Sequence, residues 1–224
     1  LKFFFFSVST YNSITNKQTI MENVVKEVRI EDKVLKIYND NWADSPRSWD
    51  NLAKMIFLGK HKSLGDKHDF DPQMNFSSRN AFIVNGEILV KKHFKDVAII
   101  KAVHLYEHSG TSISTKFEYP YNCQWDSGTV GFVIVTKSDI KKDFNVKRIT
   151  KKLLEQAERI LDGEVETLNQ YISGEVYRFE VLKVVDGKEE HEDSCGGFYG
   201  SDFATNGITD YISDERLVEA LKAA

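Results

Sequence analysis

The stretch from His104 to Val135 constrains the fold of this chain more than any other part of the sequence. It ends in the apolar run Val130–Val135, and it begins inside a second run, Val97–Tyr106, which is almost continuously apolar. Short runs of this kind are typical of strands buried on both faces of a sheet. We therefore expect the two strands to lie at the centre of a β-sheet. The polar and aromatic loop between them is a place where a site could be built.

Capping residues and apolar periodicity predict four helices elsewhere. A serine–proline start and a glycine end indicate a helix over Ser45–Leu58, and a capping box indicates a short helix over Thr136–Phe144. The longest apolar stripe with helical spacing predicts a helix over Val146–Ser173, with Asn145 as its cap. Ser213 can cap a last helix near the end of the sequence.

Two further segments are expected to join the sheet. They are Val28–Tyr38, which a polar break divides, and Val176–Val185, which ends at an Asp-Gly turn. Residues Ala81–Val90 fit a hairpin with Asn85-Gly86 as its turn; in the alternative, Gly86 precedes a short helix that ends near Phe94. Because strands and helices are mixed rather than regularly alternating, the sequence predicts an α+β fold. We expect a single domain over residues 21–224, with a mixed β-sheet, one long helix and two or three shorter packed helices.

The composition is that of a globular protein without a strong bias toward one class of partner. Of the 224 residues, 41% are hydrophobic, which can build a core, and the net charge of −4 argues against polyanion binding over the whole surface. The only two cysteines, Cys123 and Cys195, favour free thiols over a disulfide scaffold. No apolar run approaches the ~20 residues of a membrane-spanning helix. We therefore expect a cytoplasmic protein with no membrane partner.

The first twenty residues differ from the remainder. Residues 1–20 begin with Leu1 and are rich in residues encoded by A/T-rich codons, and a methionine first occurs at Met21. The Phe3–Phe6 run is too short for the apolar core of a signal peptide. Our hypothesis is that residues 1–20 are a disordered or non-native upstream extension and that the natural start is Met21.

Five sequence blocks occur together in a fixed order. They are SPRSWDNLAKM (45–55), SLGDKH (63–68), WDSGTVGFVIV (125–135), GEVYRFEV (174–181) and DSCGGFYG (193–200). In this combination the chain resembles an uncharacterised family of proteins encoded by bacteriophages, prophages and plasmids. The chain departs from the family pattern at Ala53, where the family has glycine, and at Gly196, where it has tryptophan. The resemblance implies a mobile-element setting and no particular catalytic activity.

Acidic and histidine side chains gather in two parts of the sequence and form the first candidate site. The members are Asp66, His68, Asp69 and Asp71 in a long polar connection, and His104, Glu107 and His108 at the end of the central strand. Imidazole and carboxylate groups together could hold a divalent metal for hydrolysis, with Asp126 as a further carboxylate. The spacings match no established ligand motif, and turn hydrogen bonds and caps account equally well for these residues. No cofactor is predicted, and a divalent metal remains an alternative.

Two further candidates involve a thiol and an aromatic ring. Cys195 or Cys123 could act as a nucleophile beside a histidine, and glycines around Cys195 could leave backbone amides free for an oxyanion. A small residue in a tight glycine turn explains Cys195 as well. Trp125, next to Asp126, could stack on a base or sugar if exposed, or could be buried while the following residues make a turn.

Charge is unevenly distributed, which gives the last candidate. Basic residues dominate between Lys137 and Lys152, and four of them, Lys147, Arg148, Lys151 and Lys152, surround the predicted start of the long helix. Such a cluster could contact phosphates, although a solvated helix face of mixed charge has the same pattern. Acidic residues dominate from Asp162 to Asp193.

Our leading hypothesis is a mobile-element accessory protein that binds a host or viral macromolecule, either a protein or a nucleic acid. The alternative is a metal-dependent hydrolase or nuclease that uses Asp66, His68, His104, His108 and Asp126. Whether the protein is an enzyme is left open by the sequence.

Overall fold

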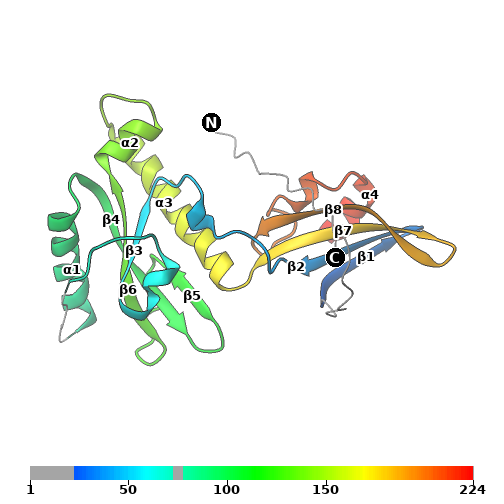
Figure 1. Cartoon of the computed structure of the whole chain (residues 1–224), viewed down its shortest axis with the longest axis horizontal. Coiled ribbons are helices and arrows are strands. Elements are labelled where there is room, and N and C mark those ends of the chain that lie inside the picture. The colour runs from blue at the N-terminus through cyan, green and yellow to red at the C-terminus, as the bar shows by residue number, and fades with distance from the viewer. Residues whose placement is uncertain (1–22, 73–77, 224) are drawn as a thin grey trace. The chain divides into compact units, whose positions relative to one another are not determined.

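The computed structural model describes residues 23–72 and 78–223, and these confirm the α+β class (Figure 1). Contacts divide them into two compact units. The terminal unit combines residues 23–43 with residues 174–223, and the inserted unit comprises residues 44–173. A single domain over residues 21–224 stays a prediction, and the hypothesis on residues 1–20 lies outside the described residues.

The terminal unit contains a four-stranded antiparallel sheet of order β1-β2-β7-β8 (Figure 1). Its strands are β1 (Val24–Ile30), β2 (Lys33–Asn39), β7 (Val176–Val185) and β8 (Lys188–Tyr199). The predicted polar break after Ile30 is the turn between β1 and β2. The predicted Asp186-Gly187 turn joins β7 to β8, with φ of 50° and 75° at the two residues. Two consecutive positive φ values match the twist of a tight hairpin.

One face of this sheet is covered by the last part of the chain. The 3-10 helix η3 (Ile208–Asp210) and helix α4 (Glu215–Ala223) bury Ile208 and Leu217 against Leu35, Ile37 and Phe179 of the strands. The predicted last helix is therefore confirmed, but Asp214, whose Oδ1 accepts from the Arg216 N–H at 3.0 Å, precedes and caps it in place of Ser213. Its burial completes a separate apolar core for this unit.

The inserted unit contains a second four-stranded antiparallel sheet, of order β3-β6-β4-β5. Its strands are β3 (Lys54–Phe57), β4 (Val97–Glu107), β5 (Thr111–Ser114) and β6 (Ser127–Thr136). The two strands predicted from the stretch His104–Val135 are β4 and β6, and they occupy the two central positions. That prediction is confirmed.

Helices cover both faces of this second sheet (Figure 1). Alternate residues of β6 point to opposite faces: Val133 and Val135 pack with α3 (Lys151–Ile172), while Phe132 and Ile134 pack with α1 (Arg79–His93). This alternation follows from the two-residue period of a strand. Helix α2 (Lys137–Asp143) follows β6 and is capped by Thr136, as predicted.

The sheet organisation differs from the single mixed sheet that the sequence predicts. Segments 28–38 and 176–185 pair with each other in the terminal unit, whereas 97–106 and 130–135 pair in the inserted unit. All strand pairs among the described residues are antiparallel. The strands that pair in the terminal unit lie far apart in the sequence, and local sequence patterns do not indicate which distant strands pair.

The predicted helix over Ser45–Leu58 is wrong. Only Pro46–Ser48 form a short 3-10 helix, η1, and Lys54–Phe57 form β3. The run Met55, Ile56 and Phe57 is buried throughout, so these residues meet the requirement of a strand covered on both faces.

Two helix starts also differ from the sequence-based expectation. Helix α1 runs from Arg79 to His93, so the predicted hairpin is wrong, and the alternative helix is present but begins before Gly86 rather than after it. Helix α3 begins at Lys151 with Thr150 as its cap, not at Val146 after Asn145. Asn145 instead has a φ of 51°, a left-handed conformation that asparagine tolerates and that ends α2 before α3 begins.

Candidate binding pocket

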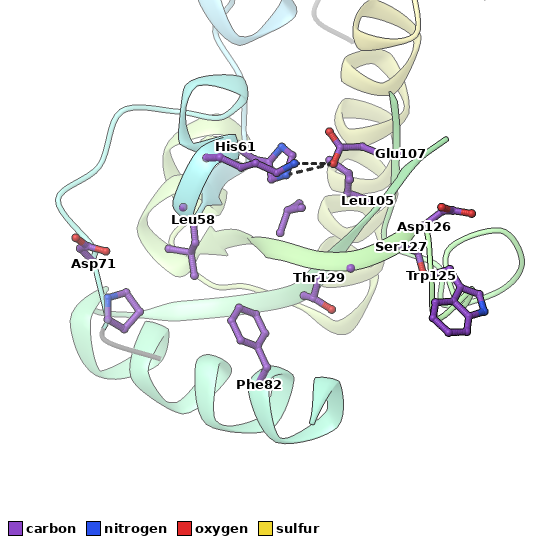
Figure 2. Close-up of a pocket in the computed structure, with 15 residues that line it drawn as sticks. Leu58, His61, Asp71, Phe82, Leu105, Glu107, Trp125, Asp126, Ser127 and Thr129 are labelled. Atoms are coloured by element: carbon purple, nitrogen blue, oxygen red, sulfur yellow. Dashed lines mark hydrogen bonds and ion pairs between the residues drawn. The ribbon is translucent and has the colours of Figure 1, made fainter. Parts of the chain in front are cut away.

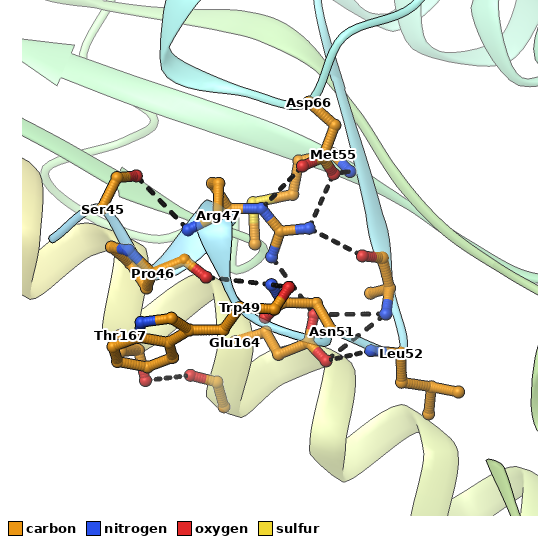
Figure 3. A network of polar contacts seen from close by, with 12 residues as sticks. Ser45, Pro46, Arg47, Trp49, Asn51, Leu52, Met55, Asp66, Glu164 and Thr167 are labelled. Carbon is orange, nitrogen blue, oxygen red and sulfur yellow. Dashed lines mark hydrogen bonds and ion pairs between the residues drawn. The ribbon is translucent and has the colours of Figure 1, made fainter. Parts of the chain in front are cut away.

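Asp66, the first residue of the predicted metal cluster, is held by Arg47 (Figure 3). The Arg47 Nε donates to Asp66 Oδ1 at 3.1 Å, and Nη2 donates to Oδ2 at 2.6 Å. The Met55 N–H also donates to Asp66 Oδ2, at 2.7 Å. Since both carboxylate oxygens already accept hydrogen bonds, Asp66 acts as a structural tie between η1 and β3.

The same guanidinium reaches a second carboxylate, Glu164 of α3, which sequence reasoning did not single out. Arg47 Nη1 donates to Glu164 at 3.3 Å, and the Leu52 and Ala53 N–H groups donate at 2.7 and 3.2 Å. Burial raises the pKa of Glu164, while the bonds from Leu52 and Arg47 oppose that rise. The SPRSWDNL block therefore forms a network of hydrogen bonds that joins an extended segment to α3.

The histidines of the predicted cluster lie in separate environments. His68 Nε2 is 2.8 Å from the Phe57 carbonyl oxygen, and His104 Nδ1 is 3.2 Å from Thr129 Oγ1. Burial lowers the pKa of His104 to about 4, with a smaller contribution from Arg79. His108 is exposed, and its Nδ1 lies 3.5 Å from Asp126. Within residues 23–72 and 78–223, no three histidine, cysteine or acidic side chains are grouped so that they could hold a metal.

The remaining acidic candidates have different surroundings. Asp69 pairs with His93 of α1 at 3.0 Å, and this contact lowers the pKa of Asp69. Asp71 and Glu107 instead line a pocket of about 610 Å³ at one end of the inserted sheet (Figure 2).

This pocket is built from four parts of the inserted unit. They are the segment from Leu58 to His61 after β3, Asp71 and Pro72, Phe82 of α1, and the facing ends of β4 and β6 with the preceding Trp125 and Asp126. Leu58, Phe82 and Leu105 contribute apolar surface, and Figure 2 shows Asp71 and Trp125 on opposite sides of it. The predicted site residues Trp125 and Asp126 therefore lie at a pocket, and Asp71 and Glu107 join them there.

Trp125 is exposed, so the interpretation in which it is buried is wrong, while a binding role for it stays a prediction. Its exposed fraction is 83%, and two other aromatic residues of the same loop, Tyr119 and Phe117, are 78% and 51% exposed. The turn expected over Asp126, Ser127 and Gly128 lies earlier, because Ser127 and Gly128 already belong to strand β6.

Arg79 holds this aromatic loop. It donates to the carbonyl oxygens of Ser127 and Tyr121 at 2.6 and 3.2 Å, and its guanidinium carbon lies 5.4 Å from the centre of the Phe117 ring. Because Arg79 is the first residue of α1, it connects the loop to a helix of fifteen residues. No sequence signal pointed to this role, since an arginine after a capping serine is ordinary in a helix start.

The side chains that line the pocket include more acidic groups than basic ones. Lys60 donates to Glu107 at 3.0 Å, and this bond is the main cause of a lowered pKa of Glu107. His61 Nε2 lies 3.8 Å from Glu107, but burial lowers the pKa of His61. Asp71 and Asp126 add two carboxylates on opposite sides. His61 is a pocket residue that sequence reasoning missed.

The other predicted site residues lie elsewhere. Cys195 is in β8 of the terminal unit, where it packs against the apolar core, and burial raises the pKa of its thiol. A raised pKa disfavours the thiolate that a nucleophile needs. Cys123 is also a free thiol. Lys147, Arg148, Lys151 and Lys152 are exposed between α2 and the first turn of α3.

Comparisons with protein-family models, curated proteins and solved structures find no match for this chain. No helix among the described residues is long and apolar enough to cross a membrane.

Proposed function

We propose that this chain is a binding protein that captures a segment of another protein in the pocket beside Trp125. The observation that carries the proposal is the 83% exposure of Trp125 at the rim of a 610 Å³ pocket. Tryptophan is among the residues that contribute most to protein interfaces, because it buries a large apolar area on contact.

The hydrogen bonds that Arg79 donates to the aromatic loop support a binding role for this loop. Ordering a flexible loop at an interface costs free energy that subtracts from affinity. Here the guanidinium already ties Tyr121 and Ser127 to the start of α1. The aromatic side chains are thus presented from a backbone whose position is fixed before the partner arrives.

The chemistry of the pocket favours one class of occupant. Its apolar surface, from Leu58, Phe82 and Leu105, suits an aliphatic or aromatic side chain. The carboxylates of Asp71 and Asp126 suit lysine or arginine on either side and would repel phosphates. We therefore propose that the partner presents an apolar side chain flanked by basic residues, and that this partner is a protein rather than a nucleic acid.

The setting of this function follows the resemblance to phage, prophage and plasmid proteins. In that setting the partner is a host or viral protein in the cytoplasm. A metal-dependent hydrolase or nuclease is less well supported, because Asp66 is engaged by Arg47 and the described residues contain no group of three metal-binding side chains.

The test is selection from a random peptide array with the purified full-length chain. We expect the selected peptides to share an apolar residue flanked by lysine or arginine. The Trp125→Ala and Asp126→Asn variants should lose this binding. The matched control is Trp42→Ala, because Trp42 is 82% exposed but lies in the terminal unit. Selection of acidic peptides, or equal loss of binding in the two tryptophan variants, would refute the proposal.

A further inference from the structure

A second surface of the inserted unit is strongly basic. It extends from α2 through the connection to the first turn of α3, and all seven of its basic side chains are exposed. These are Lys137, Lys141, Lys142, Lys147, Arg148, Lys151 and Lys152, which we call the basic surface.

The backbone brings the members of the basic surface together. The Val146 N–H donates to the Lys141 carbonyl oxygen at 3.0 Å, and the Asn145 N–H donates to that of Lys142 at 3.3 Å. With its φ of 51°, Asn145 turns the chain back on the end of α2. Lys147 and Arg148 therefore follow directly on a compact turn that already carries Lys141 and Lys142.

Little of this positive charge is neutralised within the described residues. Lys137 lies 3.8 Å from Asp96, and Lys151 lies 3.9 Å from Glu155. Against the seven basic residues, the segment from Lys137 to Lys152 contains two acidic ones, Asp139 and Asp143. The chain as a whole has a net charge of −4, so this local excess is not a reflection of overall composition.

The apolar residues of this segment are directed inward. Ile140 is fully buried, and Phe144 and Ile149 pack against the core between α3 and the sheet. A surface that inserts into a bilayer pairs its basic residues with exposed apolar side chains. A surface that reads bases of a single strand uses exposed aromatic rings. Among the described residues, the basic surface offers charge and neither of these features.

We infer that the basic surface binds the phosphate backbone of a nucleic acid duplex, without sequence preference. Lysine and arginine contacts to phosphate position a protein on a duplex and carry no sequence information. The basic surface is also distant from the pocket. The pocket lining on β6 extends to Val130, and the basic surface begins at Lys137, seven residues later, which corresponds to ~23 Å of extended strand. One chain could therefore hold a duplex and a protein partner together.

The test is binding of a fluorescent DNA duplex of random sequence by the full-length chain at increasing salt concentration. Binding to about four phosphates gives a slope near −3.6 for log affinity against log salt, so affinity falls on the order of a hundredfold between ~50 and ~200 mM salt. The Lys147→Gln, Arg148→Gln, Lys152→Gln triple variant should weaken binding at low salt. It should also reduce the slope by about one for each phosphate that the variant no longer neutralises.

The control variant carries the same charge change elsewhere on the inserted unit, as Lys62→Gln, Lys67→Gln, Lys116→Gln. These three side chains are exposed and lie outside the basic surface, so affinity should remain within about twofold of the parent. Circular dichroism spectra of both variants establish that each is folded.

Three outcomes would overturn the inference. They are the absence of duplex binding at low salt, an equal loss of affinity in the two triple variants, and binding to phosphatidylserine vesicles without binding to the duplex. The last would identify a membrane surface as the ligand. None of these outcomes depends on the peptide pocket, because Trp125 and Asp126 are unchanged in all variants.

Discussion

The Arg47 guanidinium lies within hydrogen-bond distance of both oxygens of Asp66, at 3.1 and 2.6 Å, and its own side chain is only 7% exposed. A planar guanidinium matches a carboxylate in this two-point geometry. Asp66 therefore neutralises a cation that is almost completely removed from water. Without Asp66, the Arg47 guanidinium would keep its ion pair with Glu164.

The first prediction concerns this pair. Asp66→Asn should lower the free energy of unfolding by about 1–3 kcal/mol, because it uncouples a mostly buried charge pair. The measurement is urea denaturation followed by circular dichroism. Asp69→Asn is the control, since the Asp69 side chain is 88% exposed and its replacement should change the free energy of unfolding much less. A neutral effect of Asp66→Asn, together with loss of a stoichiometric metal, would instead favour the hydrolase.

The second prediction concerns the hydrogen bonds from Arg79 to the aromatic loop. Arg79→Ala should accelerate amide hydrogen exchange over residues 115–126, because it removes the donors that hold two carbonyl oxygens of this loop. Lys92→Ala, on an exposed position of the same helix, should leave that exchange unchanged. Unaltered exchange in Arg79→Ala would show that other contacts fix the loop.

The third prediction is a pH dependence that comes from His104. Its pKa in the folded protein is about 4, below the ordinary value of 6.5. The unfolded chain therefore binds the proton more readily, and the stability contributed by neutral His104 is present above pH 6.5 and is lost as the pH falls toward 4. The slope from this group is at most ~1.4 kcal/mol per pH unit.

A variant isolates the contribution of His104 from that of the carboxylates that also titrate in acid. The measurement is urea denaturation at several values of pH from about 4 to about 7, which span the folded and ordinary pKa of this histidine. His104→Gln should reduce the pH dependence, whereas His191→Gln, at an exposed position of β8, should not. Identical pH profiles for the parent and His104→Gln would contradict the assignment.

The fourth prediction uses two glycines of the inserted unit. A Cβ atom on Gly131 would lie 2.0 Å from the Ile56 carbonyl oxygen, so Gly131→Ala should separate β6 from β3 and cost about 3 kcal/mol or more. A Cβ atom on Gly163 of α3 would meet nothing within 4 Å, so Gly163→Ala should stabilise the protein by about 0.5–1 kcal/mol. Thermal denaturation distinguishes the opposite signs, and equal signs would refute the prediction.

The fifth prediction concerns the lysines in the first turn of α3. This turn has no acidic residue, and its helix dipole is positive at the same end. Lys152→Glu should therefore raise the free energy of unfolding by about 0.3–1 kcal/mol while it weakens duplex binding, and Lys151 is left unchanged because it pairs with Glu155 at 3.9 Å. The mirror control is Lys92→Glu in the last turn of α1, which should be destabilising.

Local patterns in the sequence were sufficient for several elements. The apolar runs of β4 and β6 identified the centre of a sheet, and the capping box at Thr136 placed α2 within a residue. The exposure of Trp125 could not be predicted, because it depends on Arg79, which lies far from Trp125 in the sequence and ties the loop by carbonyl contacts that no side-chain pattern reveals.

The segment Ser45–Leu58 shows why local patterns fail elsewhere. Its proline and apolar spacing fit a helix, yet Glu164 accepts hydrogen bonds from Leu52 and Ala53 and leaves the following residues extended as β3. A contact between residues more than a hundred positions apart thus overrides the local preference. The contact between Arg47 and Asp66 is likewise one that local patterns do not reveal, and it engages a carboxylate of the predicted metal cluster.

The discontinuity of the terminal unit has a consequence for the order in which the chain is made. Hairpin β1–β2 leaves the ribosome before the inserted unit, but its partner strand β7 begins only at Val176, after the whole inserted unit. At ordinary translation rates this interval is on the order of ten seconds. During that time Leu35 and Ile37 have neither β7 nor α4 to pack against, whereas all strands of the inserted unit have been synthesised by its end. The hairpin that is synthesised before the inserted unit therefore belongs to the sheet that is completed after it.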